Sequence, residues 1–145
     1  MKRTNLIPVA LLAALMLTAF TNAQDVTGTF PENGVKTLIK GIKSGNEGLS
    51  RSSIYFAGKY KITDAIDALV DKMQKEKRPD TRILIALSLY EIGDIKGLQA
   101  VKEQAINDSD ERVKRMSTLI FDEFYKNYTG DYKFLEYFVA KSHSK

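Results

Sequence analysis

Two stretches of the chain repeat nearly the same pattern 32 positions apart. The segment FAGKYKITDAIDALVDKM occupies residues 56–73, and SLYEIGDIKGLQAVKEQA occupies residues 88–105. A period of this length is typical of architectures in which helix pairs stack on one another. Because one helix pair cannot bury its apolar stripe alone, neighbouring units must share a continuous core. The sequence therefore predicts a surface for binding rather than a pocket for chemistry.

Helix-spaced apolar residues extend the repeat in both directions. The residues Val35, Leu38, Ile39 and Ile42 recur 31 positions later as Ile66, Leu69, Val70 and Met73. Residues 33–43 thus correspond to the second helix of the later units, and the stack begins with half a unit. No segment alternates with the period of a strand for long enough to form one. We predict an all-α fold, a short α-solenoid of about two and a half to three stacked antiparallel helix pairs with capping helices.

The helix ends carry local signals. We expect Asn46, Asp94 and a residue of the turn 107–110 to cap the helices that follow them, and Thr63 or Asp64 to cap the helix between. Pro79 suits a first helical turn, and Gly93 suits a helix end. The helix after Asn46 is expected to turn a mixed set inward: Leu49, Ser53, Ile54, Phe56, Ala57 and Tyr60. Its small residues would let a neighbouring helix come close.

Residues 1–23 have the pattern of an export signal. Lys2 and Arg3 precede an apolar run over residues 6–20, and Thr21-Asn22-Ala23 offers small residues at a cleavage site. We expect cleavage of this signal peptide, with an uncleaved anchor as the alternative. The expected domains are the signal 1–23, a linker 24–32, the solenoid 33–141 and a tail 142–145. The mature chain would be exported, periplasmic or extracellular, with no transmembrane segment.

Export changes the interpretation of the charge. The whole chain is formally +4, but Lys2 and Arg3 belong to the signal, which leaves 20 basic and 18 acidic residues, a net charge of +2. Nucleic-acid binding rests on neutralising phosphates, so a nearly neutral chain gives little reason to expect it. The chain contains no Cys. Its stability must therefore come from helix packing rather than from disulfides.

Few residues suit catalysis or metal binding. The only His is His143, in the tail, so neither a thiol–histidine pair nor a soft metal site is available. The segment NDSDE at 107–111 begins like a calcium loop, but the Gly and the Glu that such a loop needs at its sixth and twelfth positions are missing. We therefore interpret it as a turn with a helix cap. The Gly-rich segment 41–48 lacks the Lys-Ser/Thr of a phosphate loop. We therefore expect no cofactor and no metal.

A row of polar residues follows the second helices. Asp67 and Asp71 share a helix face, and paired carboxylates can serve general acid–base chemistry. The repeat offset that carries Lys36 to Asp67 and Lys40 to Asp71 favours a structural role instead. It predicts the ion pairs Lys36–Asp67 and Lys40–Asp71 between neighbouring helices. The row continues to Gln99 and Glu103, and these six residues are candidate partner contacts.

Eight of the fourteen aromatic residues lie between positions 121 and 138. They could form the core of a terminal cap, because aromatic side chains bury large areas. They could also form a contact surface, where Tyr is enriched. We expect the Phe side chains inside and some Tyr side chains outside. The candidate contact residues are Tyr125, Tyr128, Tyr132 and Tyr137.

Two segments resemble the first-helix signature of HEAT-like repeats. TRILIALSLYEIGD at 81–94 has the apolar, basic and small residues in order, then Leu and a Gly-Asp turn, and DSDERVKRMSTLIF at 108–121 fits the same pattern. Leu49-Ser50 lacks the basic residue, although Arg51 follows. The resemblance covers residues 33–127 well and 128–141 poorly. It implies an α-solenoid; HEAT-like proteins mostly bind other proteins, and a few bind nucleic acid or act as chromophore lyases.

The sequence thus favours an exported, non-catalytic interaction or scaffold module that binds a protein partner through its helical-repeat surface. A lyase-like enzyme, by fold analogy alone, and a nucleic-acid-binding protein are the alternatives. The identity of the partner and the oligomeric state stay open at this stage.

Overall fold

The computed structural model describes residues 31–127, which belong to one compact unit. Six α-helices and one short 3₁₀ turn account for most of them. In chain order they are α2 (Glu32–Ile42), α3 (Glu47–Lys59), η2 (Thr63–Ala65), α4 (Ile66–Lys75), α5 (Pro79–Ile92), α6 (Ile95–Asn107) and α7 (Glu111–Asn127). Among these residues there is no β-strand, as predicted.

Four predicted segments fall wholly or largely outside the described residues. They are the signal 1–23, the linker 24–32 except for its last two residues, the last part of the solenoid at 128–141, and the tail 142–145. Within the linker, Glu32 already belongs to α2.

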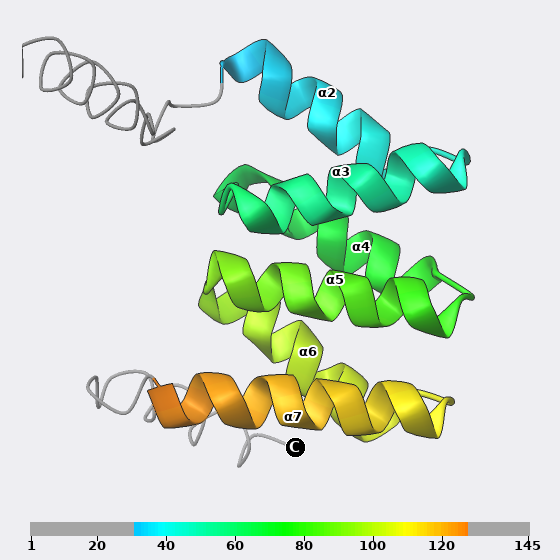
Figure 1. The fold of residues 1–145 in the computed structure, drawn as a ribbon, viewed down its shortest axis with the longest axis vertical. Helices are drawn as coiled ribbons and strands as arrows, with labels where there is room; N and C mark the ends of the chain where they lie inside the picture. The colour runs from blue at the N-terminus through cyan, green and yellow to red at the C-terminus, as the bar shows by residue number, and fades with distance from the viewer. Residues whose placement is uncertain (1–30, 128–145) are drawn as a thin grey trace, which may run out of the picture. The chain divides into compact units, whose positions relative to one another are not determined.

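The helices form two layers. Helices α3, α5 and α7 lie side by side in a first layer, and α2, α4 and α6 form the second layer behind them (Figure 1). Each second-layer helix packs on the first-layer helix that follows it in the chain: α2 on α3, α4 on α5 and α6 on α7. The result is the short α-solenoid that the repeat predicts.

The core recurs with the repeat. Ile54 on α3 and Ala86 on α5 occupy equivalent positions, and both are fully buried. In the second layer, Leu69 and Val101 are also equivalent and fully buried. Helix α5, which is apolar almost all round, lies in the middle of the stack and buries most of its residues, although Leu87 stays exposed.

Short-range signals mark most helix ends correctly. The Asn46 side chain accepts a hydrogen bond from the Leu49 backbone N–H at 3.0 Å, and Asp94 accepts from Lys96 N–H at 2.8 Å. Asp110 accepts from the N–H groups of Arg112 and Val113 at the start of α7. Pro79 begins α5, and Gly93 ends it in the left-handed region with φ 75°.

The expected cap before α4 is wrong. Neither Thr63 nor Asp64 caps α4, because the chain enters that helix through the 3₁₀ turn η2, and the residue before α4 is Ala65. The turn aligns the first backbone N–H groups with nearby carbonyls, as in the bond from Ala65 N–H to Ile62 C=O at 3.1 Å. Backbone geometry here replaces a side-chain cap.

Small residues bring the first-layer helices into close contact. A Cβ placed on Gly58 of α3 would lie 2.7 Å from the Ser88 Cα of α5. Gly41 of α2, a second-layer helix, is also crowded, because a Cβ there would overlap the Ser53 side chain of α3. Such approaches require residues without side-chain bulk. They confirm the prediction that the small residues of α3 admit a close neighbour.

Three residues predicted to line α3 are exposed instead. Leu49, Phe56 and Tyr60 are 54%, 40% and 38% exposed. Their face of α3 points to the side where a preceding first-layer helix would lie. Helix α2 packs on α3 and α4, and within residues 31–127 no first-layer helix precedes α3.

Candidate functional site

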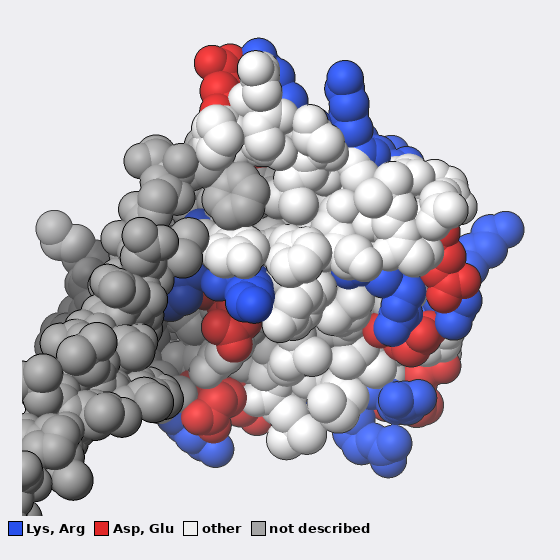
Figure 2. All heavy atoms as spheres, turned by 45° about the horizontal axis from the view of Figure 1, so that its top comes forward, with Lys and Arg blue, Asp and Glu red and all other residues white. Residues whose placement is uncertain are grey.

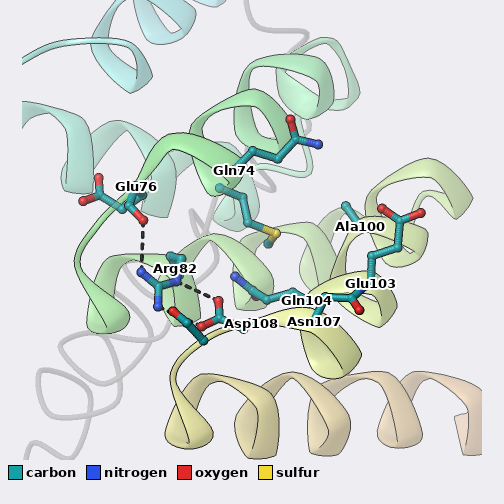
Figure 3. A pocket seen from close by; sticks show the side chains of 10 residues that line it. Gln74, Glu76, Arg82, Ala100, Glu103, Gln104, Asn107 and Asp108 are labelled. Carbon is teal, nitrogen blue, oxygen red and sulfur yellow. Dashed lines mark hydrogen bonds and ion pairs between the residues drawn. The ribbon is translucent and has the colours of Figure 1, made fainter.

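One hollow among the described residues lies where the ends of α4 and α6 meet the start of α5. It has a volume of about 390 Å³, and its lining includes Arg82, Gln104 and Asp108. Figure 3 shows the Arg82 guanidinium between Glu76, at the end of α4, and Asp108, just after α6. Its Nε and Nη2 each donate to an Asp108 carboxylate oxygen at 2.8 Å. Its Nη1 donates to the backbone carbonyls of Glu76 and Lys77 at 3.0 and 2.9 Å.

This bidentate pair is sheltered from water. The side chains of Arg82 and Asp108 are 11% and 7% exposed. Burial raises the pKa of Asp108, but hydrogen bonds from the Arg82 guanidinium and the Asp110 backbone N–H outweigh it, so the pKa lies below its ordinary value. Asp108 is therefore held as a carboxylate, and Arg82 ties the turn before α5 to the turn after α6.

The turn 107–110 acts as the sequence predicted. Asp108 and Asp110 accept hydrogen bonds from backbone N–H groups of the turn and of α7, and Asp108 also binds Arg82. Both carboxylates are thereby engaged with protein donors. The turn-and-cap interpretation of NDSDE is confirmed.

A second hollow repeats the first one unit earlier. It has a volume of about 260 Å³ and is lined by residues that include Arg51, Lys72 and Glu76. Lys72 pairs with Glu76 at 3.0 Å, and both side chains are largely buried. Adding 32 to these two positions gives Gln104 and Asp108 of the larger hollow. The hollows are thus features of the repeat, and each contains polar side chains that bind one another.

The charged side chains around the smaller hollow also form ion pairs. Arg51 donates to Asp80 at 2.7 Å, and Arg78 pairs with both Glu47 and Asp80. Burial raises the pKa of Glu76, but hydrogen bonds from the Arg78 backbone N–H and from Lys72 leave it below its ordinary value. This cluster connects α3, the turn before α5 and α5 itself.

The ion pairs predicted along the second layer are wrong. Lys36 pairs with Glu32 at 2.7 Å, and Asp71 pairs with Lys75 at 2.9 Å, each within its own helix. Asp67 does join neighbouring second-layer helices, but it pairs with Lys96 of α6. Lys96 comes about one helical turn before the position that the repeat offset implies.

The remaining candidate residues are dispersed. Glu103 lines the larger hollow, and Gln99 of the same helix is half-buried. Tyr125, near the end of α7, is 45% exposed. Tyr128, Tyr132 and Tyr137 lie outside the described residues. Among residues 31–127, the structure does not gather the predicted contact residues into one site.

A different surface repeats across the first layer. Tyr55 on α3, Leu87 on α5 and Leu119 on α7 are spaced by 32 and are 51%, 42% and 60% exposed. We call these three residues the first-layer ladder. Their helices lie side by side in the first layer (Figure 1), so the three equivalent positions recur from one helix to the next. A hollow of about 190 Å³ opens between Leu87 and Leu119.

On each of the three helices, a charged residue lies one helical turn after the ladder residue. Lys59, Glu91 and Glu123 hold this position on α3, α5 and α7, and all three are exposed. The sequence contained the signal for both rows, because the same period of 32 applies to exposed positions. The period is easier to recognise at buried apolar residues and at the second-layer charges, so it did not identify these two exposed rows.

These features define a class: an α-solenoid whose units present equivalent side chains to solvent. A family model of HEAT repeats matches residues 35–119, more than half of the chain, and the chain belongs to this family. HEAT repeats generally mediate protein interactions and scaffolding. Comparison with curated proteins and with solved structures finds no significant match. Within residues 31–127, no helix is both long and apolar enough to cross a bilayer.

Proposed function

We propose that the protein is an exported, non-catalytic interaction module that binds a partner protein through the first-layer ladder. The observation that carries this proposal is the recurrence of large exposed apolar side chains at one position of three successive units. Single exposed apolar residues are ordinary, but a contiguous row of them is typical of an interaction surface. The family supports the same class of function.

The ladder has the parts of a specific interface. The hollow between Leu87 and Leu119 suits an anchor side chain of the partner, because such anchors dominate binding energy when they fill a pocket. The charged row of Lys59, Glu91 and Glu123 would form the polar rim. Export is proposed from Lys2, Arg3 and the apolar run that follows them.

A lyase-like activity is supported less well. Fold analogy is its only basis. The 390 Å³ hollow contains Arg82 and Asp108, which bind each other and the backbone. A substrate in that hollow would have to displace a buried pair that also connects two turns.

Affinity capture from the periplasm or medium of the source organism tests the proposal. The wild-type chain and the double variant Leu87→Ser/Leu119→Ser would be compared, with Ile106→Ser as a matched control. Ile106 is 63% exposed but lies on α6, in the second layer. We expect the ladder variant to lose a specific protein at least about tenfold, since each truncated anchor costs more than about 1 kcal/mol.

The control should retain that protein, and circular dichroism should show all three chains equally helical. The recovered wild-type chain should begin at Gln24 if the signal is cleaved. Equal recovery by the ladder variant and the control would refute the role of the ladder. A recovered chain found only in the cytoplasm, with residues 1–23 intact, would refute export.

A further inference from the structure

The junction between α5 and α7 departs from the repeat. Where α3 meets α5, Gly58 lies so close to Ser88 that a Cβ on Gly58 would be 2.7 Å from the Ser88 Cα. Where α5 meets α7, the equivalent positions 32 residues later hold Tyr90 and Ile120. The distance between packed helices depends on the side chains at their contact. Tyr90 and Ile120 both line the hollow at this junction, which therefore follows from a local break in the repeat.

The floor of this hollow is anchored in the core. The rings of Tyr90 and Phe124 meet edge to face, with centroids 6.3 Å apart and an interplanar angle of 84°. Phe124 is 6% exposed and belongs to a buried cluster with Leu98 of α6. Ile120 is also buried. A site that is formed before its ligand arrives avoids the cost of ordering side chains on binding.

The size and lining of the hollow indicate what it can hold. Its lining residues are Leu87, Tyr90, Leu119, Ile120 and Glu123. Pockets for drug-sized ligands typically measure about 300–1,000 Å³, whereas this hollow has a volume of about 190 Å³. Figure 2 shows the first layer obliquely, with uncharged atoms across its middle and charged side chains on both sides. The hollow therefore suits one large apolar side chain of a protein partner.

The charged residues at the hollow have the same sign. Glu123 accepts a hydrogen bond from Asn127 Nδ2 at 2.9 Å, and within residues 31–127 no Lys or Arg pairs with it. Glu91, at the equivalent position on α5, is exposed and has no ion-pair partner in that range. At the α3–α5 junction, the same two positions hold Lys59 and Glu91, which have opposite signs. The α5–α7 junction thus offers two carboxylates to a partner.

The end of α5 adds to the negative charge. Glu91 lies in the last turn of α5, which contains no basic residue. The C-terminal end of a helix carries a partial negative charge, which favours a nearby cation. The basic residues of α7 closest in sequence to the lining are Arg115 and Lys126, and neither lines the hollow. A cation from a partner is therefore favoured beside Glu91 and Glu123.

We propose that the hollow takes one large apolar side chain of the partner and that a Lys or Arg close to it in the partner's sequence meets Glu91 and Glu123. The inference rests on the proposed function, because it defines the partner chemistry of the first-layer ladder. The apolar side chain would displace water from between Leu87 and Leu119. A segment with Asp or Glu beside its apolar side chain would be repelled. The hollow thus selects its partner by charge as well as by shape.

Selection from a library of random octapeptides displayed on phage tests this inference on the full-length chain. We expect the selected peptides to share a large apolar residue with a Lys or Arg a few positions away. One selected peptide, synthesised with a fluorescent label, would then be titrated with the protein and followed by anisotropy. Added salt should weaken its binding, because exposed charges are screened.

Charge variants test the role of the two carboxylates. Glu91→Gln/Glu123→Gln should weaken the selected peptide at least about threefold, since each exposed ion pair contributes modestly. The control Asp71→Asn/Glu103→Gln removes two exposed carboxylates from the second layer and should leave the affinity unchanged. Glu91→Lys/Glu123→Lys should turn the selection toward peptides with Asp or Glu. Circular dichroism should show equal helicity in all these chains.

Two apolar variants locate the peptide on the ladder. Leu119→Ser should weaken the selected peptide at least about tenfold, because it removes one wall of the hollow that holds the anchor. Tyr55→Ser, at the α3 position of the ladder, should leave the affinity unchanged. Leu119 and Tyr55 are 60% and 51% exposed, so both replacements should preserve the fold.

Different results would overturn this inference and the proposed function. Binding that Leu119→Ser weakens but Glu91→Gln/Glu123→Gln does not would refute the charge requirement and leave the ladder in place. Selected peptides without Lys or Arg would have the same meaning. Failure to select any peptide that Leu119→Ser weakens would refute both. A dimer that Leu119→Ser abolishes would assign the hollow to a second copy of the chain.

Discussion

Replacing Arg82 by Met tests whether one buried ion pair holds the middle of the stack together. Met keeps much of the apolar stem and removes the guanidinium. The variant would leave the Asp108 carboxylate, 7% exposed, without its bidentate partner. It would also leave the carbonyls of Glu76 and Lys77 without the donor at 3.0 and 2.9 Å.

The expected cost is about 3 kcal/mol, because breaking a buried pair by removing one partner typically costs about 3–5 kcal/mol. The lower value applies because Asp108 keeps the hydrogen bond from the Asp110 backbone N–H at 2.8 Å. With a slope of about 1–3 kcal/mol per molar urea for a small domain, the unfolding midpoint should fall by roughly 1–3 M. Circular dichroism during urea titration measures it.

The matched control is Lys96→Met. Lys96 and Asp67 also form an ion pair between successive units, but their side chains are 62% and 78% exposed. Exposed pairs contribute about 0–1 kcal/mol. The control should therefore move the midpoint by less than a third as much as Arg82→Met.

The pH dependence supplies a second criterion. In the wild type the pKa of Asp108 is lowered, so its contribution to stability is present above about pH 4 and is lost as the pH falls through the lowered pKa. In Arg82→Met, burial acts without the guanidinium and raises the pKa of Asp108. The difference in free energy of unfolding should therefore shrink as the pH approaches about 4. A difference below about 1 kcal/mol, or one that does not change with pH, would refute the reasoning.

Two further substitutions test the helix contacts. Gly58→Ala should destabilise by about 1–3 kcal/mol in thermal unfolding, which is typical of overpacking, because the new Cβ would overlap the Ser88 backbone. The control Gly48→Ala, whose Cβ would meet only an ordinary van der Waals contact, should be neutral or stabilising. Equal effects would disprove the close contact. Asn46→Ala should cost about 1 kcal/mol in urea titration through loss of the bond to Leu49 N–H, while Asn46→Asp should retain the cap. Similar losses in both Asn46 variants would contradict a capping role.

The fold followed from the sequence where the deciding information is local or strictly periodic. Asn46 and Asp94 cap the helices after them, because a cap depends on backbone groups two or three positions away. The core positions Ile54 and Ala86 followed from the period of 32. The predicted cap at Thr63 is wrong because a 3₁₀ turn, which has no distinctive side-chain pattern, takes the place of a side-chain cap.

The surface was harder to predict because it depends on how units stack. Asp67 pairs with Lys96 rather than Lys36, since the offset between neighbouring helices shifts the facing positions by about one turn. Phe56 was expected inside because it has helical spacing with buried residues. Its exposure is set by the absence of a covering helix in the described stack, and no property of the α3 sequence encodes that absence.

The first-layer ladder also has a consequence for alignment. A surface that presents equivalent rungs at Tyr55, Leu87 and Leu119 allows a bound segment to slide by one rung and meet another apolar side chain. The charges beside the rungs remove this ambiguity, because the sign changes from Lys59 to Glu91. A shift by one rung would bring an acidic group of the partner from Lys59 to Glu91. The change of sign along the row therefore favours a single alignment of the bound segment on a surface whose apolar side chains repeat.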